Sequence, residues 1–148
     1  MLSNKAKYGL KAMLHLAERE GQGGQLAADI AAERNIPKKF LDAILLELKN
    51  HNLLLSKKGR GGGYVLSQPA KAIQVGQVVR VLDGPLALLP CASATQFKPC
   101  TDCTDVEECR IRWVMRRARD AVADVLDNTS LKDLIAPAPS SSILYYDI

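Results

Sequence analysis

The feature that most restricts the fold is a basic, glycine-rich stretch between two short apolar runs. Residues 57–63 read Lys-Lys-Gly-Arg-Gly-Gly-Gly, with leucines at 53–55 before them and Tyr-Val-Leu at 64–66 after them. Glycine adopts positive φ at little steric cost, as tight hairpin turns require. The pattern therefore predicts two short strands joined by a slim, positively charged loop. A phosphate-binding loop is the rival interpretation, but neither G-x-x-x-x-G-K-[ST] nor G-x-G-x-x-G spacing occurs.

Three helices are expected upstream, at residues 3–18, 26–33 and 37–50, because apolar residues recur at helical spacing in each. The expected inward residues are Ala6, Leu10, Met13, Leu14 and Ala17, then Leu26 and Ile30, then Leu41, Ile44, Leu45 and Leu48. Two short helices joined by a tight turn form a helix-turn-helix, and the basic hairpin after them makes it a winged helix. A further helix at 75–83 completes this unit, which we place at residues 1–83.

The whole excess of positive charge lies in the third helix and the hairpin. The chain carries 20 Lys and Arg against 16 Asp and Glu, and residues 36–60 hold six of those cations but only two of the anions. This concentration is typical of a DNA-binding surface, although a solvated helix face with a flexible loop also explains it. A recognition helix presents its first residues to base edges, whereas a wing reaches phosphates or the minor groove. The candidates are Lys38, Lys39 and Asp42 for base edges and Lys57, Lys58 and Arg60 for the wing.

Beyond the winged helix we expect a cysteine-rich sensor loop at 84–105, a helix and final turn within 106–135, and a flexible tail at 136–148. The helix, at 106–127, bears a broad apolar face that a single domain of this size does not need for its own core. We therefore interpret it as a dimerisation helix, with a face formed by Trp113, Val114, Ala118, Ala121, Val122 and Val125. The expected fold class is mainly α with a small β-hairpin wing.

Four cysteines lie within nineteen residues, in the pattern Cys91-x8-Cys100-x2-Cys103-x5-Cys109. No apolar stretch reaches the roughly 20 residues that span a bilayer, and no signal-peptide core is present. We therefore expect a cytoplasmic protein with no membrane partner, in which thiolates or metal ligands are more usual than disulfides. The spacing leaves three interpretations open: an iron–sulfur cluster, a structural zinc site or a metal-free thiol switch.

The chain resembles the iron–sulfur cluster regulator family of winged-helix repressors, which includes IscR and nitric-oxide sensors. The resemblance covers about residues 1–135 and rests on four segments: Lys7-Tyr8-Gly9-Leu10-Lys11-Ala12, residues 36–48, the wing at 58–66, and residues 73–84. It implies a homodimer that binds palindromic promoter DNA. It also implies a 2Fe–2S or 4Fe–4S cluster held by three cysteines, which match Cys91, Cys103 and Cys109.

Two positions depart from the family's pattern. IscR takes its fourth ligand from a histidine three residues after the last cysteine, where this chain has Arg112. The nitric-oxide sensors use a first-helix carboxylate of the partner subunit, where this chain has Lys7. Since neither cation is a metal ligand, Cys100 is the expected substitute, with Asp102 or Asp105 as less usual choices.

We therefore expect a dimeric DNA-binding transcription regulator, a repressor, that senses redox state, iron or nitric oxide through a cluster on the four cysteines. One alternative gives those cysteines zinc or no metal, and another is an iron–sulfur carrier or scaffold protein. An enzyme is not expected, because two histidines leave little acid–base machinery. We expect His15 to pack on the first helix and His51 to face solvent or DNA.

Overall fold

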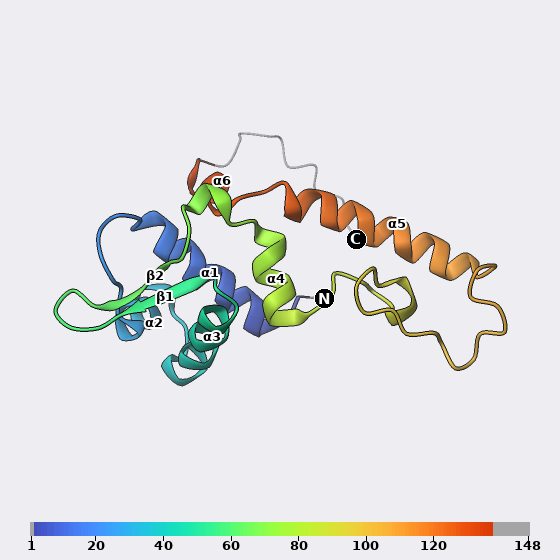
Figure 1. Ribbon diagram of the computed structural model, residues 1–148, viewed down its shortest axis with the longest axis horizontal. Helices are drawn as coiled ribbons and strands as arrows, with labels where there is room; N and C mark the ends of the chain where they lie inside the picture. The colour runs from blue at the N-terminus through green and yellow to red at the C-terminus, as the bar shows by residue number, and fades with distance from the viewer. Residues whose placement is uncertain (1, 138–148) are drawn as a thin grey trace.

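The computed structural model describes residues 2–137, so most of the predicted tail lies outside the described residues. Its N-terminal half contains α1 (Asn4–Glu18), α2 (Ala27–Arg34), α3 (Lys38–Asn50), the strands β1 (Leu54–Lys57) and β2 (Gly63–Leu66), and α4 (Val75–Asp83). Figure 1 shows these elements gathered into one unit, from which a single long helix extends. The predicted fold class, mainly helical with one antiparallel hairpin, is confirmed.

One apolar core joins the helices of this unit. The four predicted inward residues of α3, namely Leu41, Ile44, Leu45 and Leu48, are all buried. The prediction for Leu26 is wrong, because its side chain is 55% exposed. Leu26 is the extended residue that precedes α2, at φ −72° and ψ 140°, so the helical periodicity does not apply to it.

The hairpin is attached to the helices by a third backbone segment. The two strands pair from Leu54 with Leu66 to Lys57 with Gly63. The N–H of Gln25 donates to the Tyr64 carbonyl at 2.9 Å, and the N–H of Tyr64 donates back at 2.8 Å. The first strand extends past the predicted residues 53–55, so Lys57 lies on the strand itself and only the next two cations occupy the turn.

The long helix α5 (Arg110–Asp127) begins four residues later than predicted. Residues before it form a turn in which the Asp105 carboxylate accepts hydrogen bonds from the N–H groups of Glu107 and Glu108. Such local side-chain bonds compete with helix formation. Cys109 then caps the helix, with its sulfur accepting from the N–H of Arg112 at 3.4 Å.

After α5 the chain returns to the winged-helix unit. The short helix α6 (Leu131–Ile135) places Leu131, which has no exposed surface, in the same core as α1 and α3. Two backbone hydrogen bonds of 2.9 Å stabilise this packing: the N–H of Val75 donates to the Thr129 carbonyl, and the N–H of Leu131 donates to the Ile73 carbonyl. Two 3₁₀ turns that the sequence did not indicate, η1 (Ala70–Ala72) and η2 (Pro90–Ala92), flank α4.

Candidate DNA interface and cysteine site

The predicted base-reading residues lie together on the exposed side of α3. Lys38, Lys39 and Asp42 are all exposed in the first two turns of the helix. The Lys38 ammonium lies 2.8 Å from the Asp42 carboxylate, so these two side chains form an i,i+4 ion pair, whereas Lys39 forms no ion pair within residues 2–137. Asp42 therefore has a cation beside it, in an ion pair that is exposed on both sides.

Sequence reasoning missed two apolar residues on this surface. Phe40 is 42% exposed and Leu46 is 51% exposed, although both belong to the recognition helix. Phe40 packs edge-on against Tyr8 of α1, with ring centres 5.8 Å apart. Their positions outside the stripe of inward leucines are the signal that identifies them as outward-facing.

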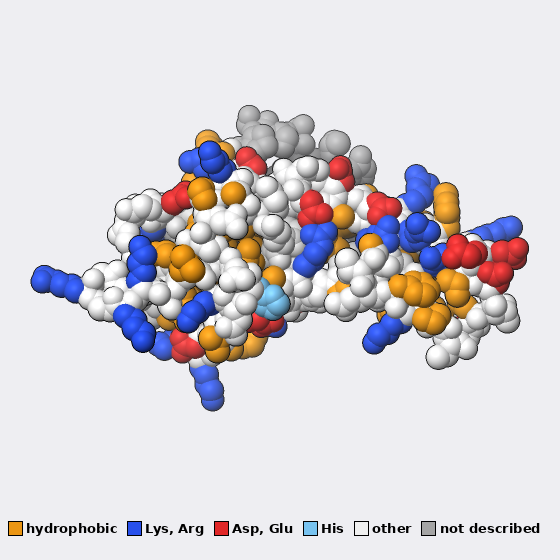
Figure 2. All heavy atoms as spheres, in the orientation of Figure 1, with side chains coloured by type: hydrophobic (Ala, Val, Ile, Leu, Met, Phe, Trp, Pro, Cys, Tyr) orange, Lys and Arg blue, Asp and Glu red, His pale blue; other side chains and the backbone are white. Residues whose placement is uncertain are grey.

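The hairpin cations are exposed at one end of the molecule. Lys57, Lys58 and Arg60 have exposed side chains, and Figure 2 shows basic side chains projecting from the end that the hairpin forms. Gly62 keeps the turn thin: a Cβ atom there would lie 2.5 Å from the Lys57 carbonyl oxygen. Gly59 adopts φ +87°, a conformation that favours glycine.

The structure brings the four cysteines into one cluster at the other end of the molecule. Cys91 is buried in η2, and the other three are half-buried on the loop that precedes α5. The Cys91 thiol interacts with Cys100, and Cys103 interacts with both Cys100 and Cys109. Burial raises the pKa of the Cys91 and Cys103 thiols. Hydrogen bonding to Cys100 adds to the rise in the pKa of Cys91 but offsets part of it for Cys103.

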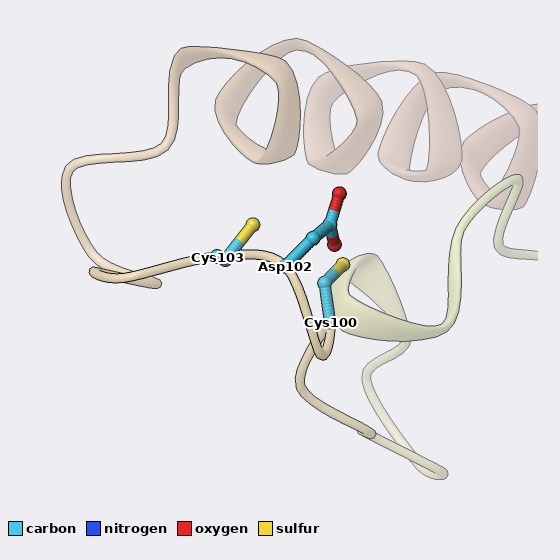
Figure 3. A group of neighbouring side chains, drawn as sticks. All are labelled: Cys100, Asp102 and Cys103. Atoms are coloured by element: carbon cyan, nitrogen blue, oxygen red, sulfur yellow. The ribbon is translucent and has the colours of Figure 1, made fainter.

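One carboxylate belongs to the same cluster. The ligand atoms of Cys100, Asp102 and Cys103 all lie within 4.8 Å of one another. Figure 3 shows these three side chains on one turn of the loop, beneath α5. Thiolates are the ligands that iron–sulfur clusters and zinc prefer, so a set of four thiols with one adjacent carboxylate suits either group.

Two arginines of α5 hold the segment that carries the cysteines, residues 91–109, through backbone carbonyls of η2. The Arg112 Nε donates to the Cys91 carbonyl at 3.0 Å, and the Arg119 Nη1 donates to the Ala92 carbonyl at 2.5 Å. Arg112 also stacks on Phe97, with its guanidinium carbon 5.6 Å from the ring centre. Arg112 thus stands beside the cysteines as a backbone anchor.

Both histidines lie away from the cysteine site. His15 is fully buried in α1, where its Nδ1 is 3.3 Å from nitrogens of both Arg19 and Arg34. Burial, with the nearby arginines, lowers the pKa of His15. His51 is exposed just after α3. The packing predicted for His15 is confirmed.

The helix α5 exposes most of its apolar surface. None of its residues is buried, and four of its apolar side chains at helical spacing are 44–62% exposed: Ile111, Val114, Val122 and Val125. Trp113 is 61% exposed and lies beneath the guanidinium of Arg117. Across the described residues, no helix has the combination of length and apolarity that a membrane span needs.

Comparisons with known proteins agree with this architecture. A profile of the Rrf2 family, described as "Iron-dependent Transcriptional regulator", matches residues 2–137. The chain is 36% identical to a putative HTH-type transcriptional regulator, rrf2-like, of Rhodobacter capsulatus, over 97% of this chain and 99% of the relative. It is 30% identical to the HTH-type regulator IscR of Erwinia tasmaniensis, over 90% of this chain and 78% of that protein.

Solved structures give the same result. CymR of Bacillus subtilis, described as its global cysteine regulator, aligns with a TM-score of 0.73 at 34% identity, covering 90% of this chain and 95% of that one. T. potens IscR aligns with a TM-score of 0.72 at 25% identity, covering 99% and 96%. The resemblance inferred from the sequence is therefore confirmed, and so is the expectation of a regulator in place of an enzyme. The chain belongs to the Rrf2 family of helix-turn-helix transcriptional regulators.

Proposed function

We propose that this regulator is a homodimeric repressor whose affinity for operator DNA depends on an iron–sulfur cluster held by Cys91, Cys100, Cys103 and Cys109. The observation that carries the proposal is the proximity of the thiol of Cys91 in η2 to those of the loop before α5, with η2 anchored to α5 by Arg112. Three of the thiols match the ligands of the family's cluster-binding members, and Cys100 supplies a fourth. When bound, such a cluster provides a centre that responds to iron supply, oxidants or nitric oxide.

The DNA-reading surface consists of α3 and the hairpin. Lysine donates to guanine acceptors, and a carboxylate accepts from the cytosine amine, which gives Lys39 and Asp42 their roles. Lys38 holds Asp42 at 2.8 Å and orients it. The cations of the hairpin reach phosphates or the minor groove, where they add affinity and little base discrimination.

A second copy of the chain accounts for the exposed apolar face of α5. That face would place four large side chains in water in a monomer, at exposures of 44–62%. Dimers of helix-turn-helix proteins bind two half-sites about one DNA turn, or roughly 34 Å, apart. The position of α5 in the dimer therefore sets the separation of the two recognition helices.

Contacts at both ends of α5 connect the cysteines to the DNA-reading unit. Arg112 near its start and Arg119 at its middle hold the segment that carries the cysteines. At its end, the Asp127 carboxylate accepts two hydrogen bonds from Arg80 of α4, at 2.5 and 2.7 Å. A change in the loop therefore has a direct route through α5 to the winged helix.

A metal-free thiol switch is the second candidate. The interaction between the Cys91 and Cys100 thiols favours it, because neighbouring thiols form disulfides. Two relatives by structure are forms of Staphylococcus aureus CymR, one of them oxidised. A structural zinc site fits the same donor set, whereas an iron–sulfur carrier or scaffold does not account for the basic hairpin.

Anaerobic purification of the full chain, followed by iron, sulfide and zinc assays and a visible spectrum, tests the cluster. We expect a coloured protein with comparable iron and sulfide, and light scattering should give a mass of twice 16.1 kDa. A colourless protein with about one zinc per chain contradicts the cluster and supports the structural site. A colourless, metal-free protein that resists reconstitution leaves the thiol switch.

Variants then connect the cysteines to DNA binding. Cys103→Ala and Cys109→Ala should bind the operator with the same affinity whether or not reconstitution is attempted, whereas the control Thr104→Ala, at an exposed residue of the same loop, should respond as the wild type does. An unaltered response in both cysteine variants contradicts the proposal. Salt-independent or sequence-independent duplex binding by the wild type would instead favour the carrier alternative.

A further inference from the structure

The short helix η2 presents backbone carbonyls that have no partner within the helix itself. The last carbonyls of any helix lack partners within it. In η2, the Pro90 carbonyl accepts from the backbone N–H groups of Ser93 and Lys98, at 3.2 and 3.3 Å. The next two carbonyls, of Cys91 and Ala92, accept instead from side chains of α5 at 3.0 and 2.5 Å.

The two arginines that donate these hydrogen bonds are less exposed than their neighbours Arg116 and Arg117. Arg112 and Arg119 are seven residues apart, which is two helical turns, and they lie on one face. Each side chain is 15% exposed, whereas Arg116 and Arg117 are exposed. Arg112 also donates to the Val106 carbonyl at 3.4 Å and to the Glu107 carboxylate at 3.2 Å. It therefore joins η2 to the segment that enters α5.

Cys91 takes part both in these hydrogen bonds and in the thiol cluster. Its thiol interacts with Cys100, while its carbonyl accepts from Arg112. A change in what the Cys91 sulfur binds thus acts on the same residue whose backbone is held by α5. The guanidinium group is planar and rigid, so it transfers a displacement of the carbonyl more faithfully than a flexible ammonium.

We propose that Arg112 and Arg119 are positioning residues that transmit the state of the cysteine site to α5 through the Cys91 and Ala92 carbonyls. This inference rests on the proposed function. IscR has a metal-binding histidine at the position of Arg112. In this chain Arg112 would not bind the cluster but would hold the backbone carbonyl of Cys91, one of the proposed ligands. The cysteines would then bind the cluster, and the two arginines would carry a change at the cysteines to α5.

The test compares Arg112→Ala and Arg119→Ala with Arg116→Ala, a control on the same helix. The full chain is prepared anaerobically in cluster-loaded and metal-free forms, and its affinity is measured for a duplex selected from a random library by the wild type. We expect the two forms of the wild type and of Arg116→Ala to differ about tenfold in affinity, a usual size for allosteric coupling. Arg112→Ala and Arg119→Ala should contain wild-type iron and sulfide, yet their two forms should differ less than about twofold. Arg112→Lys should restore part of the difference.

Hydrogen exchange of the metal-free full chain gives a second readout that needs no cluster. The amides of residues 91–98 should exchange faster in Arg112→Ala and Arg119→Ala than in the wild type and in Arg116→Ala. If Arg112→Ala fails to load iron, Arg119→Ala decides the question, because its contact is one residue farther from the thiol.

The proposal is overturned if both variants keep the tenfold difference, or if Arg116→Ala loses it as well. Failure of the proposed function is distinguishable, because there the wild type itself shows no cluster or no difference between its two forms. In that case unchanged exchange at residues 91–98 in both variants would still refute the role of the two arginines in holding η2 and the residues after it.

Discussion

Removing the two cations in the turn of the hairpin, Lys58 and Arg60, tests whether that element binds DNA phosphates. Both side chains are exposed, and neither forms an ion pair within residues 2–137. They are therefore free to neutralise phosphates. The variant Lys58→Ala/Arg60→Ala leaves the glycines of the turn and the pairing of β1 with β2 unchanged, so it alters charge and little else.

The expected magnitude follows from counting charges. Each phosphate neutralised by a cation contributes about 0.9 to the slope of log affinity against log salt. Two cations per chain and two chains per dimer make four contacts, so the slope should become shallower by about 3.6. Between 50 and 200 mM salt, the wild type should then lose roughly 150-fold more affinity than the variant does.

Fluorescence anisotropy with a selected duplex at five salt concentrations measures this slope. Lys132→Ala, which removes an exposed cation from α6, outside the proposed DNA-reading surface of α3 and the hairpin, is the matched control and should leave the slope unaltered. The loss in the double variant should also be similar on specific and random duplexes, because phosphate contacts carry no sequence information. A slope change below about 1, or a loss confined to one sequence, would refute phosphate binding by the hairpin.

Three further perturbations follow from the packing. Burial lowers the pKa of His15 below its usual 6.5, so the unfolded chain takes up a proton first as the pH falls. The free energy of unfolding of the wild type, measured by urea titration, should therefore decrease as the pH falls below about 6.5, by at most about 1.4 kcal/mol per pH unit, and His15→Gln should remove this part of the decrease. Gly62→Ala would place a Cβ 2.5 Å from a strand carbonyl oxygen, so DNA affinity should fall while Ser56→Ala on the same hairpin keeps it. An unchanged affinity in Gly62→Ala would show that the turn can adjust. Leu131→Ala empties a fully buried site and should cost about 2–5 kcal/mol in the free energy of unfolding. Leu134→Ala on the same helix, where the side chain is 43% exposed, is its control.

Local patterns predicted the winged helix well because its helices follow simple rules. Leu41, Ile44 and Leu45 are buried where helical spacing places them. The errors arise at element ends, where capping overrides periodicity. Leu26 precedes its helix and turns outward, and α5 starts at Arg110 because the Asp105 carboxylate forms a competing turn.

The candidate site likewise has features that the sequence could predict and features that it could not. Cysteine spacing indicated that the thiols act together, and the structure brings the Cys100 and Cys103 sulfurs within 4.8 Å of each other, with Cys91 and Cys109 near enough to influence the pKa values of the group. The hydrogen bonds from Arg112 and Arg119 to η2 could not be predicted, since they join residues 21 and 27 positions apart across an irregular loop. In the sequence these arginines look the same as the exposed ones that surround them.

The return of the chain through α6 determines which stretches of the sequence build the winged-helix domain. Since Leu131 completes the core that α1 and α3 begin, the winged-helix domain is discontinuous, and the cysteine loop with α5 is an insertion within it. The bond between Arg80 and Asp127 holds the two ends of this insertion side by side. An insertion that is attached at both ends has fewer ways to move relative to its domain than a module on a single linker. Under the proposed function, a rearrangement at the cysteines would therefore act on the DNA-binding domain through both attachments.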